Sequence, residues 1–311
     1  MFDEFTIVGI GEALFDVYPG GQRVGGAPLN VAVMAHQLAG PHGGRGVVVS
    51  RVGQDRLGQR LIDELRGRGV VTEYIQTDPD RPTGRVFIEF GADGQPRYEV
   101  ATNVAWDVLS YDFDGEDLAM TCAAVAFGTL AQRDAQARNS IYRFLDTARQ
   151  AERLFDVNLR EPLPDHRTIR RSCERATILK LNTQELEVVA RMLAIERPAA
   201  GGDEDAGCDE LVAGLLRMFK FELVVLTRGE RGTVIYERGG GRCEGAAARF
   251  EPEQGATPVG AGDACSAAVL VGRVLQWPTQ RIADVANRVG ALVAARAEAT
   301  PELEELATDG T

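Results

Sequence analysis

The segment Thr257-Pro258-Val259-Gly260-Ala261-Gly262-Asp263-Ala264-Cys265-Ser266-Ala267-Ala268 joins a glycine-rich loop to the start of a helix of small residues. Such a loop directs several backbone N–H groups at one point, where the helix N-terminus adds partial positive charge. The segment therefore predicts an anion-binding site with the carboxylate of Asp263 beside it. That pairing suits phosphoryl transfer, in which the loop stabilises developing charge and the carboxylate takes a proton from the attacking hydroxyl. The alternative is an ordinary turn with a first-turn acid favoured by the helix dipole.

The composition narrows the class of protein. A chain of 311 residues with 44% hydrophobic residues is long enough for one large α/β domain. Its net charge of −12 argues against a nucleic-acid-binding protein. The five cysteines are odd in number and lack a CxxC pair, so neither a disulfide framework nor a zinc site is expected. Acidic residues at the N-terminus and short apolar runs lead us to expect a cytoplasmic protein with no membrane contact.

Strand and helix patterns alternate along the chain. Apolar strands are expected near 5–11, 47–53, 123–128, 154–160, 178–182 and 223–229. Helices are expected between them, for example at 31–39, 138–149 and 282–296, and residues 196–210 are predicted to form an acidic loop between two helices. This order predicts a mostly parallel central sheet with helices on both faces.

Two nucleotide-binding motifs are only partly matched. Gly9 and Gly11 have the spacing of a dinucleotide-binding turn, but Leu14 occupies its third small position and no helix pattern follows. Gly53 and Gly58 have the spacing of a P-loop, but Gln59 stands where that motif requires lysine.

Residues 83–100 break the alternation with a predicted β-hairpin whose turn is at 91–95. A hairpin inserted into a βα series is a candidate lid, which would exclude water during phosphoryl transfer. The alternative is an edge of the main sheet.

Polar residues collect where strands end and helices begin. Gly25 and Gly26 allow close approach of a ligand to the backbone, and Asn30 offers a donor and an acceptor to a polyol. The alternation of Asp156, Asn158 and Arg160 along an expected strand predicts that the three share one side. Asn182 and Glu185 have the spacing of a helix capping box, which explains them at least as well as a metal site does.

Taken together, these segments resemble the PfkB, or ribokinase-like, family of carbohydrate kinases over nearly the whole chain. The segment 25–32, reading GGAPLNVA, looks like the N-terminal family signature, and 259–264, reading VGAGDA, looks like the C-terminal one. Residues 182–185 match the N-x-x-E motif between them. The segments 11–16 and 156–160 look most like those of fructokinases, and ketodeoxygluconate kinases share some of these features.

The resemblance implies a ribokinase-like fold in one domain, 1–311, with a small β lid formed by segments at about 12–25 and 83–101. It implies ATP-dependent phosphorylation of a sugar or nucleoside hydroxyl with Mg²⁺, and possible homodimers through the lid. The implied site residues are as follows: Asp263 as general base, Gly260, Ala261 and Gly262 as anion hole, Asp16, Gly25, Gly26, Asn30 and Arg160 for the sugar, Thr227, Gly229, Gly232 and Asn287 along the nucleotide, and Asn182 and Glu185 ordering Mg²⁺ through water.

The chain differs from the family pattern at three places, which limits the properties that the resemblance implies. The C-terminal signature usually begins Asp-Thr and ends in Phe, whereas this chain has Thr257-Pro258 and Cys265. The missing aspartate helps to bind a monovalent cation in some family members, and Glu298 replaces a frequent glycine near the same ion site. K⁺ activation is therefore not carried over, and a binding protein without catalysis is the alternative from another class.

Overall fold

The computed structural model describes residues 4–90, 96–196 and 204–303. Within these residues the chain forms a nine-stranded sheet in the order β13-β12-β11-β10-β9-β8-β1-β4-β5. Its strands are β1 (Phe5–Ile10), β4 (Gly44–Gly53), β5 (Ile75–Asp78), β8 (Ala124–Gly128), β9 (Glu152–Asp156), β10 (Ile178–Asn182), β11 (Leu223–Thr227), β12 (Thr233–Glu237) and β13 (Arg242–Glu244). Neighbours from β5 to β11 are parallel, and β12 and β13 are antiparallel, which confirms the predicted sheet.

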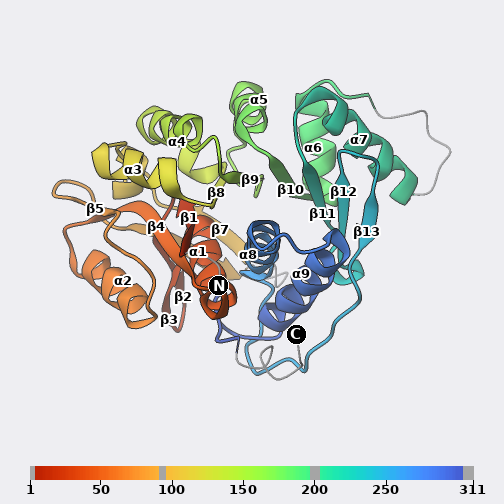
Figure 1. Ribbon diagram of the computed structural model, residues 1–311. Coiled ribbons are helices and arrows are strands. Elements are labelled where there is room, and N and C mark those ends of the chain that lie inside the picture. The colour runs from red at the N-terminus through yellow and green to blue at the C-terminus, as the bar shows by residue number, and fades with distance from the viewer. Residues whose placement is uncertain (1–3, 91–95, 197–203, 304–311) are drawn as a thin grey trace.

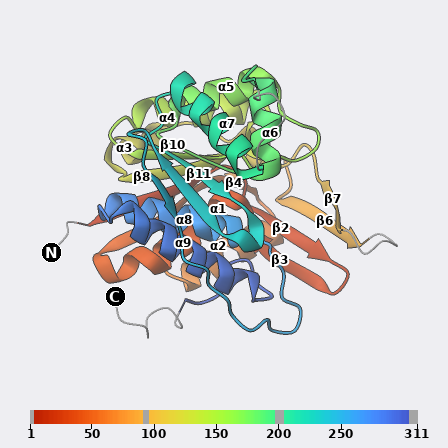
Figure 2. The same ribbon diagram turned by 90° about the vertical axis from the view of Figure 1, so that its right-hand side faces the viewer.

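Helices cover both faces of this sheet (Figures 1 and 2). One face carries α1 (Ala27–Ala39), α2 (Arg56–Gly67), α8 (Ala261–Val274) and α9 (Thr279–Ala294). The other carries α3 (Phe113–Thr121), α4 (Ala135–Thr147), α5 (His166–Arg175), α6 (Thr183–Met192) and α7 (Glu204–Met218). Central strands such as β8 are buried along their whole length, as expected for a parallel sheet covered on both sides.

Helix α8 owes its central place to its small residues. Ala264, Ala267 and Ala268 are fully buried, and the helix packs between α1 and α9. Short side chains let neighbouring helices approach closely, so α1 and α8, which are far apart in the sequence, pack side by side.

The sheet order reverses between β1 and β8. The chain runs outward from β1 to β4 and β5 in one direction, and from β8 to β11 in the other. Such a reversal at the carboxyl ends of parallel strands is where open α/β sheets bind ligands. The loops after β1, β8 and β9 meet there.

A separate four-stranded sheet projects from this region, in the order β3-β2-β6-β7 (Figure 2). Its strands are β2 (Leu14–Tyr18), β3 (Gly21–Gly25), β6 (Gly84–Phe90) and β7 (Pro96–Val100). The hairpin predicted at 83–100 therefore belongs to a small sheet of its own and is not an edge of the main sheet. Its predicted turn at 91–95 lies outside the described residues.

Two local predictions are wrong. Strand β9 ends at Asp156, and Asn158 has a φ of 38°, so 156, 158 and 160 do not lie along one side of an extended chain. The predicted loop at 196–210 is replaced from Glu204 onward by α7; residues 197–203 lie outside the described residues. Burial of Leu211, Val212 and Leu215 stabilises that helix in spite of its acidic start.

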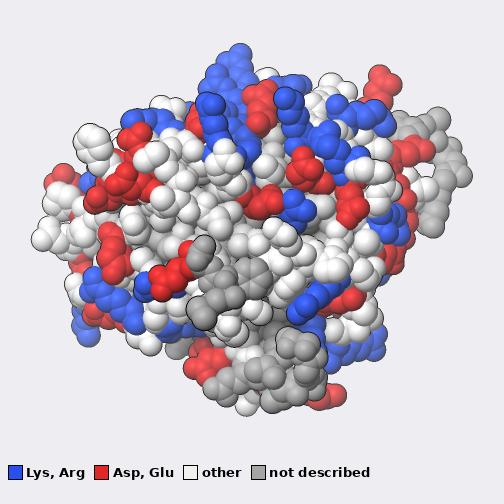
Figure 3. Space-filling view, in the orientation of Figure 1, with Lys and Arg blue, Asp and Glu red and all other residues white. Residues whose placement is uncertain are grey.

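Acidic and basic side chains are interspersed over the face shown in Figure 3. Within the described ranges, none of the helices combines the length and the apolar character needed to span a membrane.

Candidate active site

The segment predicted to bind an anion forms the N-terminus of α8. Gly260 is the N-cap, with a φ of 86°, and a Cβ there would lie 2.3 Å from the carbonyl oxygen of Ala299. Only glycine fits this position, because both the left-handed backbone and the close carbonyl exclude a side chain. No side chain caps the helix, and its first i to i−4 bond joins the Ala264 N–H to the Gly260 carbonyl at 2.8 Å. The amides of Gly262 and Asp263 precede that bond and can donate to an anion.

Asp263 stands at this helix end, where it accepts a hydrogen bond from Asn30 Nδ2 at 2.8 Å. Its pKa is raised from 3.8 to about 7, mainly by burial and next by the negative charge of Asp156. The hydrogen bond from Asn30 and the charges of Lys180 and Arg160 lower the pKa but do not cancel those effects. A carboxylate with a pKa near neutrality is suited to take a proton at physiological pH.

Most of the residues predicted to bind sugar lie on β2 and around the start of α1, and Asn30 among them contacts Asp263. Asn30 is 3% exposed in the first turn of α1, and Asp16 lies on β2 against Gly25, where a Cβ would be 2.4 Å from its Oδ2. Gly26 precedes α1 with a φ of 116°, and a Cβ there would lie 2.4 Å from the Glu12 carbonyl. The two glycines thus let the small sheet, the Glu12 backbone and the start of α1 pack closely, because a side chain at either position would collide.

Arg160 lies in the loop after β9 and completes this group. Burial raises the pKa of Asp16 to about 6, and the positive charge of Arg160 opposes this effect. The same charge lowers the pKa values of Glu12 and Asp263, so the guanidinium lies within electrostatic reach of all three acids. The loop therefore brings Arg160 to the site even though the strand predicted to carry it ends at Asp156.

The residues predicted to lie along a nucleotide form a second group. Thr227 ends β11, and Gly229–Arg231 form a short 3₁₀ turn before Gly232. Asn287 on α9 packs against Gly232 and donates a hydrogen bond from Nδ2 to the Ala246 carbonyl at 3.1 Å. The Asn287 amide therefore ties together the segments that border this region. Thr233 Oγ1 lies 3.9 Å from Cys265 Sγ, which links this group to α8.

The segment after α9 packs against the loop before α8. The Thr257 N–H donates to the Arg296 carbonyl at 3.0 Å. Arg23 on β3 donates to the Ala297 carbonyl, and Arg68 donates to Thr300 Oγ1 at 2.7 Å. Two arginine side chains therefore bring positive charge to the segment after α9, which contacts Thr257.

Comparison with known families decides the identity at this point. Residues 17–306 match the family described as pfkB family carbohydrate kinase. The chain belongs to the PfkB family of carbohydrate kinases. As a PfkB protein it is a phosphotransferase with a sugar acceptor, as the sequence resemblance predicted.

Relatives and solved structures agree with this assignment. Fructokinase-1 of Oryza sativa subsp. japonica is 28% identical to this PfkB chain, over 96% of the chain and 94% of that protein. An uncharacterized sugar kinase of Pyrococcus horikoshii, solved in complex with ATP, is 25% identical with a TM-score of 0.79, over 97% of this chain and 98% of that one. The 2-dehydro-3-deoxygluconokinase of Thermotoga maritima shares the fold at 21% identity, with a TM-score of 0.78 over 98% of this chain and 100% of that one.

Asn182 and Glu185 are held as a capping box at the start of α6. Asn182 Oδ1 accepts from the Glu185 N–H at 2.9 Å, and Glu185 Oε2 accepts from the Asn182 N–H at 2.8 Å. Glu185 Oε1 accepts from the Leu159 N–H at 2.9 Å. Each carboxylate oxygen keeps a lone pair, which fits contact with Mg²⁺ through water. In the part of the chain that the structure describes, no three His, Cys, Asp or Glu residues form a metal site, so a metal in this PfkB site would depend on phosphate and water ligands as well.

Sequence reasoning assigned no role to Glu12, Lys180 or Ser266, although all three lie at the site, and it named Asp156 only as a polar residue at the end of a strand. Glu12 is 3% exposed, its Oε2 has no hydrogen-bond partner among the described residues, and burial raises its pKa to about 7. The negative charge of Asp263 contributes to that rise. The signal for Glu12 was its place between Gly11 and Asp16 in a motif typical of fructokinases.

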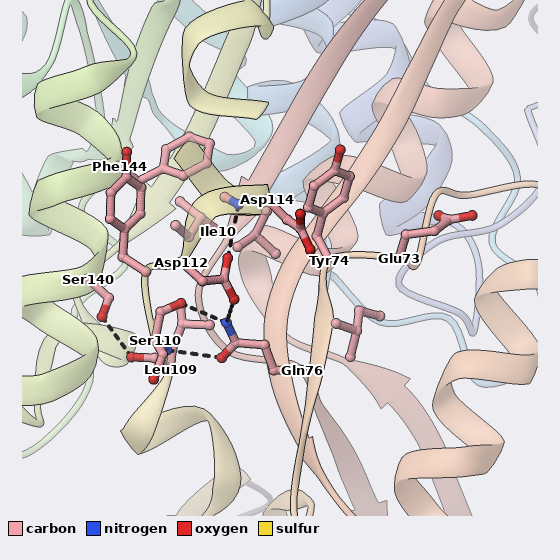
Figure 4. Close-up of a pocket in the computed structure, with 14 residues that line it drawn as sticks. Ile10, Glu73, Tyr74, Gln76, Leu109, Ser110, Asp112, Asp114, Ser140 and Phe144 are labelled. Carbon is pink, nitrogen blue, oxygen red and sulfur yellow. Dashed lines mark hydrogen bonds between the residues drawn. The ribbon is translucent and has the colours of Figure 1, made fainter. Parts of the chain in front are cut away.

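Two cavities outside the anion loop differ in their relation to this PfkB site. A cavity of about 210 Å³ between α3, α4 and β5 contains none of the predicted site residues, and several of its polar groups bond to one another (Figure 4). For example, Gln76 Nε2 donates to the Ser110 carbonyl and to Asp112 Oδ2, at 2.7 and 3.1 Å. A cavity of about 320 Å³ includes Asp16, Thr257 and Val259 and so borders the site.

Proposed function

We propose that this PfkB kinase is an ATP-dependent, fructokinase-like sugar kinase that phosphorylates a hydroxyl group of a monosaccharide. The observation that carries the proposal is the hydrogen bond between Asn30 and Asp263 at the N-terminus of α8. It joins a residue suited to bind a sugar hydroxyl to a carboxylate suited to deprotonate one, beside a helix end suited to bind phosphate.

Each residue of the proposed site has a defined part in this reaction. Asp16, Gly25, Gly26, Asn30 and Arg160 hold the sugar hydroxyls. Asp263 accepts the proton of the attacking hydroxyl as its oxygen bonds to phosphorus. The loop Gly260, Ala261 and Gly262 forms the anion hole, in which the amides of Gly262 and Asp263 at the start of α8 stabilise the charge that develops on the transferred group. When bound, Mg-ATP supplies the γ-phosphoryl group and neutralises charge on its phosphates.

Residues of the second group would bind the nucleotide. Thr227, Gly229 and Gly232 lie in the connection from β11 to β12. Asn287 on α9 packs against this connection at Gly232. Asn182 and Glu185 would order Mg²⁺ through water from the start of α6. The capping box supports this role because it fixes the Glu185 carboxylate in one orientation.

The small sheet would act as the lid of a single domain that spans 1–311. Its support is that the segments at 12–25 and 83–101 pair with each other in a sheet separate from the large one. Closing over the sugar would exclude water from the transfer. Its exposed strand edges also suit a homodimer through the lid, which sedimentation would test.

A ketodeoxygluconate or nucleoside kinase is the alternative within the family. Arg160 favours the first of these, because a guanidinium beside the acids at the sugar site can also bind a substrate carboxylate. The loop forms in spite of Pro258, whose carbonyl accepts from the Ala261 N–H at 3.2 Å, and this favours catalysis over binding alone.

The test is ADP release by the purified protein with Mg-ATP over a panel of fructose, ribose, ketodeoxygluconate and adenosine. Turnover of one class, lost in Asp263→Asn, supports a kinase and names its substrate. Sugar binding by calorimetry without ADP release over the whole panel would contradict the proposal and favour a binding protein.

A further inference from the structure

A buried ion pair lies behind the N-terminus of α8. Lys180 Nζ is 2.7 Å from Asp156 Oδ2, and the two side chains are only 7% and 6% exposed. Ser266 on α8 donates a hydrogen bond to the same carboxylate oxygen at 2.9 Å. The pair follows from the register of β9 and β10, in which Lys180 is the neighbour of Asp156. Because both charges lose their hydration, such a pair is not explained by stability alone.

The positive end of the pair lies under the anion-binding loop. A Cβ at Gly262 would be 3.1 Å from Lys180 Nζ, so the ammonium group packs against the backbone of that loop. Lys180 is one of two lysines in a chain with 34 basic residues. A compact ammonium fits beneath a backbone where a planar guanidinium needs more room. In this buried position its charge adds to that of the helix end in attracting an anion.

The negative end of the pair acts on Asp263. Asp156 is the charged neighbour that raises the pKa of Asp263 most, and Lys180 lowers that pKa by less. Oδ1 of Asp156 accepts no hydrogen bond from the described residues, so its charge is only partly compensated.

The other groups that face Asp263 come from different elements. They are Asn30 on α1, Arg160 in the loop after β9, and Glu12 after β1. Asn30 carries no charge, and Arg160 and Glu12 each carry a single charge. None of the three therefore does what the Asp156–Lys180 pair does, which is to place a positive charge behind the anion hole and a negative charge beside Asp263.

We propose that the Asp156–Lys180 pair is a positioning device for phosphoryl transfer, with its ammonium behind the anion hole and its carboxylate beside the base. The inference rests on the proposed function and adds to it two residues that do not touch the substrate.

The test compares Asp156→Asn, Lys180→Met and the double variant. Asparagine keeps the shape of Asp156 and can still accept from Lys180 and Ser266, but it removes the negative charge. We expect the pKa of Asp263 to fall by about one pH unit in Asp156→Asn and to rise in Lys180→Met. The double variant should return it toward the wild-type value while kcat stays roughly tenfold below wild type, because the charge behind the anion hole is gone.

The primary readout does not depend on turnover. A ¹³C NMR titration of carboxyl-labelled protein follows Asp263 directly, with Asp263→Asn to assign its signal. The pH profile of kcat/KM over the best sugar is the second readout. The double variant also guards against misfolding, since it leaves no unpaired buried charge.

Asp107→Asn is the matched control. It breaks the ion pair between Arg133 and Asp107, which has the same 2.7 Å length but lies on η2 (Ala105–Val108), away from α8. This variant should lower the unfolding temperature without moving the titration of Asp263. Opposite movements in the two single variants support the inference. Unchanged titrations, or movements in the same direction, would overturn it, whereas a wild-type protein that turns over no sugar would overturn only the proposed function.

Discussion

Replacing Asp263 by asparagine should abolish turnover and at the same time stabilise the folded protein. The carboxylate is held beside the negative charge of Asp156 in a region that disfavours ionisation, and its pKa is raised from 3.8 to about 7. Asparagine keeps a side-chain oxygen that can accept the hydrogen bond from Asn30 Nδ2, so the substitution removes mainly the charge.

The magnitude follows from the two pKa values. A carboxyl group with a raised pKa contributes its full stability below pH 3.8, and this contribution is lost as the pH rises through 7. A pKa difference of one corresponds to about 1.4 kcal/mol, which sets an upper limit of about 4 kcal/mol for this residue. Because Asp263 is partly exposed and water screens its charge, we expect asparagine to stabilise the fold by about 1–3 kcal/mol at pH 8, and by less at pH 5.

Urea unfolding of both proteins at pH 5 and pH 8 measures the difference. Asp55→Asn is the control of opposite sign. Burial acts to raise the pKa of Asp55, but hydrogen bonds from Thr83 and Gly58 outweigh it and hold the pKa below its usual range. That carboxylate stabilises the fold above its usual pKa, so Asp55→Asn should be less stable than wild type at pH 8. The reasoning fails if Asp263→Asn gains no stability over wild type between pH 5 and pH 8.

Three further predictions concern the same region. Gly260→Ala should cost about 2 kcal/mol or more in thermal unfolding and abolish turnover, because a Cβ would meet the Ala299 carbonyl at 2.3 Å in a left-handed backbone; a stable, active variant would contradict the role of the loop. Glu12→Gln removes the buried charge beside Asp263, so the acid limb of kcat/KM should move to lower pH by about half a pH unit, and a limb that stays in place would separate Glu12 from the base. Turnover in K⁺ and in Na⁺ should agree within about twofold, because Thr257 lacks the carboxylate that a cation site needs; a rate that requires K⁺ would refute this.

Much of the fold could be predicted because it is encoded in local patterns. Apolar strands such as β8 and β11, and the glycines before α1 and α8, can be recognised from a few consecutive residues. The strand predicted to reach residue 160 failed because apolar alternation continued past Asp156, whereas the backbone at Asn158 is left-handed. Alternation alone carries no information about a positive φ.

The missed site residues have a different cause. Lys180 appears in the sequence as an isolated charge inside an apolar strand, and only the register of β9 and β10 makes it the partner of Asp156. The raised pKa of Glu12 likewise depends on burial by segments distant in the sequence. Motif spacing finds residues that act through one loop, but it does not find pairs that are created by sheet topology.

The bond between Asn30 and Asp263 joins positions 233 residues apart. While the protein is being synthesised, Asn30 leaves the ribosome long before Asp263 does. A nascent or truncated chain that ends before α8 therefore lacks Asp263 and, under the proposed function, has no base for phosphoryl transfer. Under the proposed function, the packing of α1 against α8 thus makes phosphorylation possible only once the chain has been synthesised through α8.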